Sequence, residues 1–302
     1  MTERETIHNR VVRPWAAGAV AILLCTTISG DHASTVADKK FPICAARDTE
    51  MEVAEYTRID PIEQSASTIS IPEVSRRQVL QRFGSNVVKI MTGQDSGGTG
   101  FVLETSRGRP IIVTAGHVVR DHAISSVSVQ KLDEQGVVEY GVQGGCVMDS
   151  MTGPDELAND IALLALDDEA TIVSRLELGS SDTATTMVNI NYQVHQPASS
   201  DEKAGQHDVR DPQVQSVKPV ASNGLVTTVL SGFDAQGEPV LPGASGSPVL
   251  TPEGKVAGMF VAYSPYPIDK KAQSEYGVKG KSWQGWMVDA DRIASVLAAE
   301  GL

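Results

Sequence analysis

The stretch "LPGASGSPVL" (241–250) places two glycines and two serines between short apolar runs. Glycine, serine and proline all favour turns, so the stretch can be an ordinary surface turn. It can also present a nucleophile, because glycines free the backbone on both sides of Ser245. The amides of Gly243 and Ser245 then converge on one point and form an oxyanion hole. Ser247 is the weaker candidate nucleophile, because Pro248 restricts it to extended geometry.

A serine nucleophile needs a general base and a group that orients this base. His117 in "IIVTAGHVV" is the candidate base, because an apolar strand pattern runs into it and its small neighbours leave room for other groups. Asp160 in "ANDIALLAL" is the candidate orienter, because it stands directly before an apolar run. A carboxylate buried there needs a partner, and an imidazole N–H is suitable. Taken singly, a lone histidine at a strand end and a strand-capping aspartate remain alternatives. The other histidines lack such a setting: His8, His32, His122, His195 and His207.

Short apolar runs separated by turn residues follow one another from residue 86 onward. Strands of this length and spacing are typical of an all-β barrel or sandwich. A parallel α/β sheet would need helices between the strands, and the pattern has none there. The predicted strands are 86–91, 98–104, 110–115, 125–132, 136–143, 160–166, 187–195, 224–230, 247–251 and 255–263.

Two helical patterns flank these strands. The stretch 72–84 has a proline near its start and a glycine just past its end, which predicts a short helix. The stretch 288–302 predicts a second helix, which Asp289 or Asp291 can cap. The polar stretch 196–213 predicts a surface loop. One face of the second helix is apolar: Ile293, Val296 and Leu297.

The first 37 residues have the order of a secretory signal peptide. Three arginines precede the uncharged stretch 14–30, and small residues follow at Ala33 and Ala37. We expect cleavage after one of these alanines. An uncleaved membrane anchor is the second interpretation, although the apolar stretch is short for a span of about 20 residues. Lipid attachment at Cys25 is the third.

Removal of this segment leaves two cysteines, Cys44 and Cys146. In an exported chain a pair of cysteines favours one disulfide, here between the segment preceding the domain and the domain itself. Two free buried thiols are the alternative. The mixed, aperiodic stretch 38–71 predicts an extension with little structure of its own.

The composition is that of an ordinary globular protein, with 41% hydrophobic and 21% charged residues in 302. The formal net charge of −13 makes nucleic acid and anionic membrane surfaces poor partners. We predict no metal site and no cofactor. The glycine-rich "DSGGTG" (95–100) leads into a strand pattern rather than a helix, so it does not predict a phosphate loop.

Four motifs together resemble the trypsin-like (chymotrypsin-fold) serine endopeptidases. The bacterial members look most similar, including the heat-shock-type periplasmic proteases and the glutamyl endopeptidases. The order His, Asp, Ser is the one that this fold uses. The resemblance covers 72–302 and rests on Gly98–Phe101 (GTGF), Thr114–His117 (TAGH), Asn159–Leu164 (NDIALL) and Gly243–Pro248 (GASGSP).

This resemblance implies two six-stranded antiparallel barrels and a C-terminal helix, with the active site in the cleft between the barrels. His117 would take the proton of Ser245, Asp160 would orient His117, and Ser245 would form an acyl-enzyme with a peptide or protein substrate. The enzyme would be secreted or periplasmic. It would contact a membrane only if its first segment stays uncleaved.

Two departures from the family pattern qualify these expectations. Pancreatic-type members carry an aspartate before the serine that pairs with a new N-terminus, whereas Ala244 cannot form this ion pair. The stretch "GMFVAY" (Gly258–Tyr263) resembles the strand that lines the substrate pocket, and Phe260, Val261 and Ala262 are its expected substrate-binding residues. Glutamyl endopeptidases have a histidine where Phe260 stands, and trypsin has an acidic residue where Pro239 stands. We therefore expect an apolar or small side chain at the cleaved position.

Two further functions are compatible with these motifs. A binding protein on the same fold, with weak or lost catalysis, is the first alternative, because a fold does not establish activity. An esterase with the same acyl chemistry is the second. Its usual nucleophile turn is Gly-x-Ser-x-Gly between a strand and a helix, whereas position 247 is serine and no helix is predicted after it.

Overall fold

The computed structural model describes twelve segments of the chain, all within one unit, Val36–Leu302. The predicted signal peptide lies outside the described residues, as does most of the predicted loop 196–213. The described segments are 39–45, 57–58, 73–93, 97–106, 108–133, 136–148, 156–166, 176–180, 187–192, 212–231, 243–278 and 281–302.

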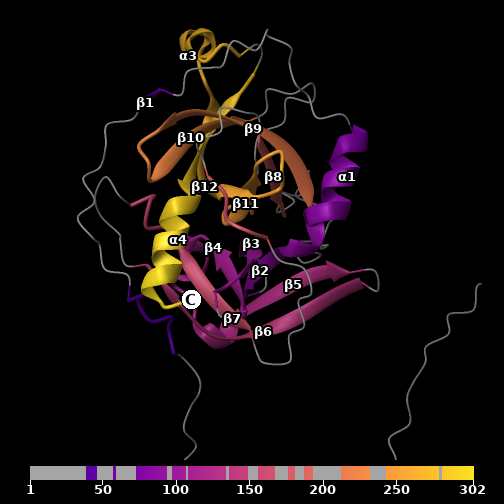
Figure 1. Ribbon diagram of the computed structural model, residues 1–302, viewed down its shortest axis with the longest axis vertical. Coiled ribbons are helices and arrows are strands. Elements are labelled where there is room, and N and C mark those ends of the chain that lie inside the picture. Colours follow the sequence, from indigo (N-terminus) through magenta and orange to yellow (C-terminus); the bar gives the residue numbers. More distant parts are fainter. Residues whose placement is uncertain are drawn as a thin grey trace, which may run out of the picture. The chain divides into compact units, whose positions relative to one another are not determined.

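Six antiparallel strands close into an N-terminal barrel in the order β2-β3-β4-β7-β6-β5 (Figure 1, magenta to pink). Each of them overlaps a predicted strand. Strands β4 and β7 are apolar runs bounded by turn residues, and each is buried except at one end. Burial of these runs stabilises the barrel. The strands are β2 (Val87–Thr92), β3 (Gly97–Glu104), β4 (Pro110–Thr114), β5 (Val127–Asp133), β6 (Gly136–Val147) and β7 (Ala162–Leu166).

A second six-stranded antiparallel barrel follows, in the order β9-β10-β13-β12-β11-β8, and it closes through β8 and β9 (Figure 1). Both closed barrels confirm the all-β prediction, and closure leaves few unpaired strand edges. A short strand β1 (Thr57–Arg58) pairs with the end of β9. The strands are β8 (Met187–Asn191), β9 (Gln213–Ser222), β10 (Val226–Ser231), β11 (Ser247–Leu250), β12 (Val256–Pro267) and β13 (Trp283–Asp289).

Strands β9 and β13 were not predicted from the sequence. Pro219 interrupts the pattern of β9 and lies at a register shift against β10, where its missing N–H disturbs the ladder least. Gly285 and polar neighbours interrupt β13. The predicted closing helix also begins two residues late, because Val288 and Asp289 belong to β13.

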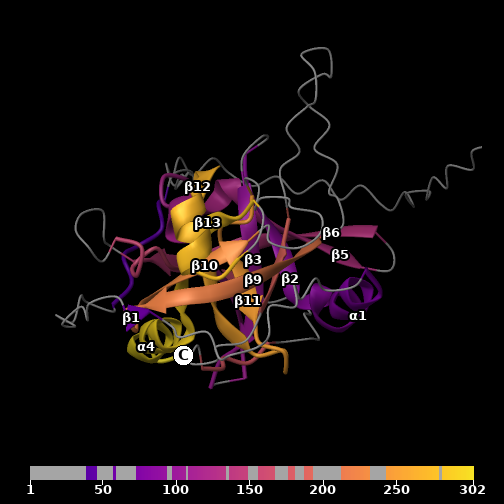
Figure 2. The same cartoon turned by 90° about the horizontal axis from the view of Figure 1, so that it is seen from above.

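The two predicted helices are present as α1 (Glu73–Phe83) and α4 (Ala290–Ala299), which lie on opposite sides of the barrels (Figures 1 and 2). Asp289 occupies the N-cap position of α4, but its side chain does not cap the helix. The carboxylate is fully buried and instead accepts a hydrogen bond from Ser222 Oγ at 3.2 Å. Shorter helical elements are α2 (Gly116–Val119), α3 (Lys270–Glu275), η1 (Gly84–Asn86) and η2 (Ile124–Ser126).

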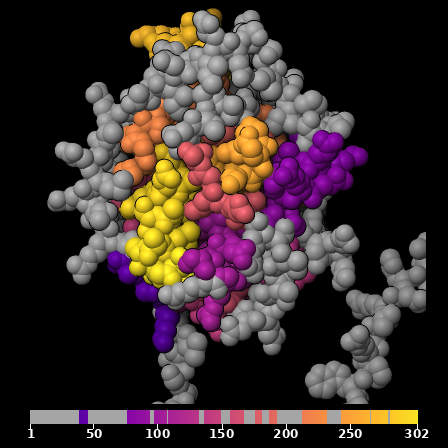
Figure 3. Space-filling view, viewed as in Figure 1, coloured from indigo at the N-terminus to yellow at the C-terminus, as the bar shows by residue number. Residues whose placement is uncertain are grey.

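The described residues form one large and two smaller apolar clusters. The large cluster fills the N-terminal barrel and continues into the contact between the barrels and under α4, through the predicted apolar face of that helix. The outer face of α4 forms part of the molecular surface (Figure 3, yellow). The second cluster lies in the C-terminal barrel and includes Phe260 and Ala244.

The predicted extension is attached to the N-terminal barrel. Phe41 is buried, the backbone of Cys44 pairs with Val147, and the N–H of Ala45 donates to Glu300 of α4. Cys44 and Cys146 form a disulfide, as one of the two interpretations of the sequence predicted. Residues 39–45 therefore gain their structure from the barrel and α4 rather than from a fold of their own.

Candidate active site

His117 and Asp160 are brought together by two neighbouring strands. Strand β4 leads into α2, which carries His117, and Asp160 lies two residues before β7. Because Thr114 of β4 pairs with Ala162 of β7, the residues just beyond this pair are also neighbours. The sequence expectation that an apolar strand positions each of these side chains therefore agrees with the structure.

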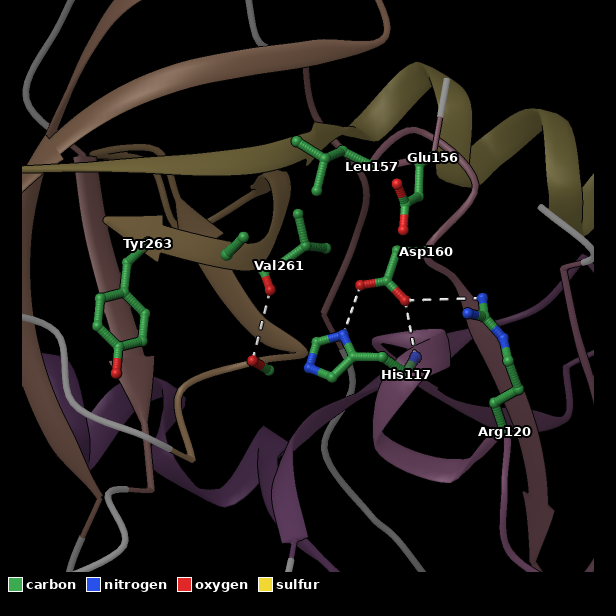
Figure 4. A pocket seen from close by; sticks show the side chains of 9 residues that line it. His117, Arg120, Glu156, Leu157, Asp160, Val261 and Tyr263 are labelled. Carbon is green, nitrogen blue, oxygen red and sulfur yellow. Dashed lines mark hydrogen bonds and ion pairs between the residues drawn. The ribbon is translucent and has the colours of Figure 1, made fainter. Parts of the chain in front are cut away.

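Asp160 holds His117 through two hydrogen bonds (Figure 4). The backbone N–H of His117 donates to Asp160 Oδ1 at 2.7 Å, and its ring Nδ1 lies 2.6 Å from Asp160 Oδ2. With Nδ1 as the donor, Nε2 is left as a base that faces away from the carboxylate. The Asp160 side chain is 10% exposed and the His117 side chain 46% exposed. The carboxylate is thus buried and paired, while the imidazole remains accessible.

Two arginines lie around this pair. The Nη2 atom of Arg120 is 4.0 Å from Asp160 Oδ1, on the side opposite to the imidazole (Figure 4). Arg292 of α4 donates a hydrogen bond to the side chain of Asn159, the residue before Asp160. Both Asn159 and Arg292 are buried. The loop that presents Asp160 is therefore braced by α4.

The nucleophile turn has the backbone that its glycines permit. Gly243 and Gly246 have positive φ angles of 96° and 86°. At Gly246 a side chain is excluded a second time, because a Cβ atom would overlap the carbonyl oxygen of Thr99 and the hydroxyl of Thr114. Ser245 lies between the two glycines, and its Oγ is 3.4 Å from the carbonyl oxygen of Val261. Through Gly246 the turn packs closely against Thr114, at the end of the strand that precedes His117.

The amides of the turn divide into two groups. The N–H of Gly246 donates to the Phe260 carbonyl at 2.8 Å, and the N–H of Ser247 donates to the Ala244 carbonyl at 3.0 Å. Within the part of the chain that the structure describes, the N–H groups of Gly243 and Ser245 have no acceptor. These two amides are the ones that the sequence assigned to an oxyanion hole, and both are available for a ligand.

Ser247 is placed where it cannot attack a substrate. It is fully buried, and its Oγ accepts a hydrogen bond from Asn189 Nδ2 at 2.6 Å. The same Asn189 amide donates to the carbonyl of Pro248 at 3.2 Å. Ser245, by contrast, lines the cavity described below.

A cavity of about 380 Å³ opens beside His117 and Ser245. Of the three residues predicted to bind substrate, Val261 and Ala262 line it. Leu157, Tyr263 and three charged residues also line it (Figure 4). Phe260 does not line it. Its side chain is fully buried in the C-terminal barrel. The register of β12 against β13 shifts between Phe260 and Ala262, so regular alternation is interrupted there and both Val261 and Ala262 reach the cavity. The complete lining is His117, Arg120, Glu156, Leu157, Asp160, Ser245, Val261, Ala262 and Tyr263.

Sequence reasoning missed the cavity residues Arg120, Glu156, Leu157 and Tyr263. Arg120 lies one helical turn after His117, and Leu157 lies three residues before Asp160, so proximity in the chain was the available signal. Among the described residues one group of potential metal ligands exists, Cys44, Cys146 and Glu300, but both sulfurs are used in the disulfide.

The two closed six-stranded antiparallel barrels with a C-terminal helix are the chymotrypsin fold. A family model described as a trypsin-like peptidase domain matches residues 98–259, more than half of the chain. The chain belongs to the trypsin-like peptidase family and is a serine endopeptidase of that family, so peptides and proteins are its substrate class. A search of curated protein sequences found no match.

Several solved protease structures are similar to this chain. The Rv3671c protease from M. tuberculosis in its active form shares 18% identity, with 74% of this chain and 84% of that chain covered and a TM-score of 0.46. Deg5 shares 14% identity, with 72% and 90% covered and a TM-score of 0.47. The serine endoprotease from Yersinia pestis shares 13% identity, with 74% and 67% covered and a TM-score of 0.45.

Proposed function

We propose that the protein cleaves peptide bonds with a Ser245–His117–Asp160 triad and is exported from the cytoplasm. The observation that carries this proposal is the double hydrogen bond from His117 to a buried Asp160. A buried carboxylate that receives both the backbone and the ring N–H fixes the orientation and tautomer of the imidazole. The accessible ring nitrogen is then available to take a proton.

In the proposed mechanism, His117 Nε2 accepts the proton of Ser245 Oγ while this oxygen attacks the substrate carbonyl. The oxyanion that forms is bound by the N–H groups of Gly243 and Ser245. The imidazolium, stabilised by Asp160, gives its proton to the leaving amine, and water then hydrolyses the acyl-enzyme by the same route. The hydroxyl of Ser245 lies near Val261 in the free protein, and catalytic hydrogen bonds of this kind often tighten only with substrate bound.

For specificity, we propose an apolar or small side chain at the cleaved position. Apolar Leu157, Val261 and Ala262 contribute much of the wall beside Ser245. A panel of peptides that differ only at the cleaved position tests this proposal. Preference for Lys, Arg or Glu at that position would overturn it.

For localisation, we propose a secreted or periplasmic enzyme with a signal peptide at 1–37, an extension at 38–71 and the protease domain at 72–302. The Cys44–Cys146 disulfide supports export, because disulfides persist in oxidising compartments. Among the described residues no helix is long and apolar enough to cross a membrane. N-terminal sequencing of the exported protein tests the boundary, with a start at Ser34 or Asp38 expected. Retention of Met1 in the exported protein would favour the membrane anchor.

We also propose that the enzyme needs no newly freed N-terminus for activity. Ala244 is buried among apolar residues, so the turn holds no carboxylate that could pair with an ammonium group. Near the start of the extension, the carbonyl of Lys39 accepts a hydrogen bond at 3.0 Å from the N–H of Ile124, which lies in the N-terminal barrel and not beside the turn. A short tag placed directly before Asp38 should leave turnover unchanged. Loss of turnover that is restored by cutting back to Asp38 would contradict this expectation.

A fluorophosphonate probe tests the triad and separates the proposal from an inactive binding protein. We expect a single adduct on Ser245, located by mass, which disappears in the Ser245→Ala variant and persists in the matched Ser247→Ala variant. Well-folded protein that takes up no probe would favour the binding protein. If the protein takes up the probe, digestion of casein by untreated protein then distinguishes a protease from an esterase.

A further inference from the structure

We propose that Thr99 is a positioning residue that fixes the oxyanion turn and the nucleophile against the strand that carries His117. The inference rests on the proposed function, because it assigns a role to a residue that touches the turn and not the substrate. Thr99 belongs to the Gly-Thr-Gly-Phe motif of β3, whose role the triad alone does not explain.

The Thr99 side chain forms hydrogen bonds with the backbone of the C-terminal barrel. Its hydroxyl is fully buried and donates to the Gly243 carbonyl at 2.7 Å, and it accepts from the N–H of Tyr192 at 2.9 Å. The hydroxyl's one proton and one of its lone pairs are thereby used. A single side chain of the N-terminal barrel thus holds two backbone positions of the C-terminal barrel, Gly243 in the turn before Ser245 and Tyr192 just after β8.

The Thr99 backbone extends the same link in both directions. Its N–H donates to the Ser245 carbonyl at 2.9 Å, and its carbonyl accepts from Thr114 Oγ1 at 2.7 Å. Thr114 lies three residues before His117 on β4. The chain of bonds therefore runs from the oxyanion turn and the nucleophile, through Thr99, to the strand that leads to the general base.

The neighbouring glycine makes this close contact possible. A Cβ atom on Gly98 would lie 2.9 Å from the Ser245 carbonyl oxygen and 2.7 Å from a methyl group of Val118. The turn therefore lies directly on the β3 backbone, where no other side chain fits between them. The motif combines a glycine that admits the turn with a threonine that bonds to it.

The consequence for catalysis follows from the geometry of Gly243. A glycine at a φ of 96° has access to other backbone angles, so its own residue type does not hold the turn. The bond to Thr99 fixes the carbonyl of Gly243, and the bond to the Ser245 carbonyl fixes the far side of the turn. The N–H of Ser245 lies in the backbone between these two held carbonyls and so keeps its direction before a substrate arrives, while the N–H of Gly243 is restrained from its carbonyl side. Preorganised donors of this kind stabilise the transition state most, because they need no rearrangement during the reaction.

The test compares variants that differ in this one hydroxyl. Thr99→Val keeps the shape of the side chain and removes the bond to Gly243, whereas Thr99→Ser keeps the hydroxyl. We expect kcat of Thr99→Val to fall about tenfold to a hundredfold, somewhat less than for loss of a whole oxyanion donor, with KM little changed. Thr99→Ser should retain most of kcat. Affinity for a peptide aldehyde, which forms an oxyanion on Ser245, should fall with kcat in Thr99→Val.

Thr105→Val is the matched control, since Thr105 is a buried threonine at the other end of the same hairpin. Its hydroxyl also makes two backbone hydrogen bonds, both to Arg109. We expect this variant to lose stability comparable to Thr99→Val and to keep its kcat. If Thr99→Val does not fold, the pair Thr99→Ala and Thr99→Ser replaces it, because the two differ only in the hydroxyl.

Three results would overturn the inference. The first is a Thr99→Val protein with the kcat and aldehyde affinity of the wild type. The second is equal loss of kcat in Thr99→Val and Thr105→Val, which would show a general effect of stability. The third is equal activity of the Ala and Ser variants. Failure of the proposed function is seen separately, in wild-type protein that neither turns over peptides nor takes up the fluorophosphonate probe.

Discussion

The two barrels have the same strand count and the same closure, but they differ in what fills them and in what they contribute to the site. The N-terminal barrel has a large apolar interior and holds His117 and Asp160 already bonded to each other. The C-terminal barrel has a smaller apolar cluster beside a buried polar group that includes Asn189 and Ser247. It supplies the nucleophile turn.

The two parts of the site therefore depend on different contacts for their geometry. The acid–base pair is completed within one barrel, where the pairing of β4 with β7 and the α4 brace on the Asp160 loop set its geometry. The nucleophile turn is shaped by buried hydrogen bonds below it and by Thr99 from the opposite barrel. Its geometry therefore depends on how well the two barrels pack together. Apart from Thr99, changes in the first barrel should act on the pair, and changes in the second should act on the turn.

The largest effect is expected when the pair in the N-terminal barrel is broken by Asp160→Asn. The amide keeps the shape of the side chain, but it cannot accept both hydrogen bonds of His117 and favours the wrong tautomer. We expect kcat to fall by about ten-thousandfold, with the thermal midpoint close to that of the wild type. Steady-state kinetics on a peptide substrate measure this, with the surface variant Asp121→Asn as the control. A loss below about tenfold would show that Asp160 does not orient the base.

The next effect concerns the covalent tie of the extension to the N-terminal barrel. The Cys44–Cys146 disulfide joins residues 102 positions apart. The double variant Cys44→Ser, Cys146→Ser should lose about 2–4 kcal/mol of unfolding free energy, because the unfolded chain regains loop freedom. Urea unfolding measures this, and reduced wild-type protein should match the variant. At room temperature kcat should be unchanged, since the disulfide lies outside the cleft; a parallel loss of kcat would tie the extension to the site.

A third prediction compares the two interiors directly. Asn189→Leu leaves the acceptors at Ser247 and Pro248 without their donor, and we expect it to cost about 1–3 kcal/mol of unfolding free energy. It should also lower kcat, because the base of the nucleophile turn is released. Ile90→Leu in the apolar interior conserves volume and should cost less than about 1.5 kcal/mol, with kcat unchanged. Equal effects of the two variants on kcat would remove the proposed distinction between the barrels.

The smallest effect is expected at Lys89, a charged residue that is 7% exposed on β2. Desolvation by burial lowers the pKa of Lys89 below its ordinary value of 10.5. The unfolded state therefore binds more protons than the folded state between the lowered pKa and 10.5, and this group adds stability as pH rises through that window. Lys89→Met should be more stable than wild type at neutral pH, and the difference should shrink toward about pH 10. Denaturation midpoints at both pH values measure it, and a difference that does not change with pH would contradict burial of the charge.

The same contrast explains how much of the fold was predictable. Every strand of the N-terminal barrel overlaps a predicted one. Buried strands such as β4 and β7 are continuous apolar runs between turns, and β6 shows the alternating burial of a half-exposed strand. In the C-terminal barrel, β9 and β13 contain Pro219 and Gly285, which weaken the strand pattern, and their pairing is set by neighbours far away in the chain. Local sequence carries little record of such pairing.

The site was predictable where chemistry limits the residue type. His117, Asp160 and Ser245 were chosen as candidates because of their settings in the sequence, and the structure brings them to one cavity. The prediction that Phe260 binds substrate was wrong. Its strand was recognised, but the sequence did not show that this side chain points into the barrel interior. Thr99 was quoted only as part of a motif, since a threonine hydroxyl has many ordinary uses and its partner is 144 positions away.

The hydrogen bond between Arg292 and Asn159 can form only late in synthesis, once α4 has been made. Helix α4 follows every strand of both barrels in the chain, and yet it braces the loop that presents Asp160. While the barrels are still forming, that loop lacks its brace, and the acid–base pair is held less firmly. We therefore expect a chain shortened before α4 to hold the Asp160 loop, and with it the bond to His117, less firmly than the full chain.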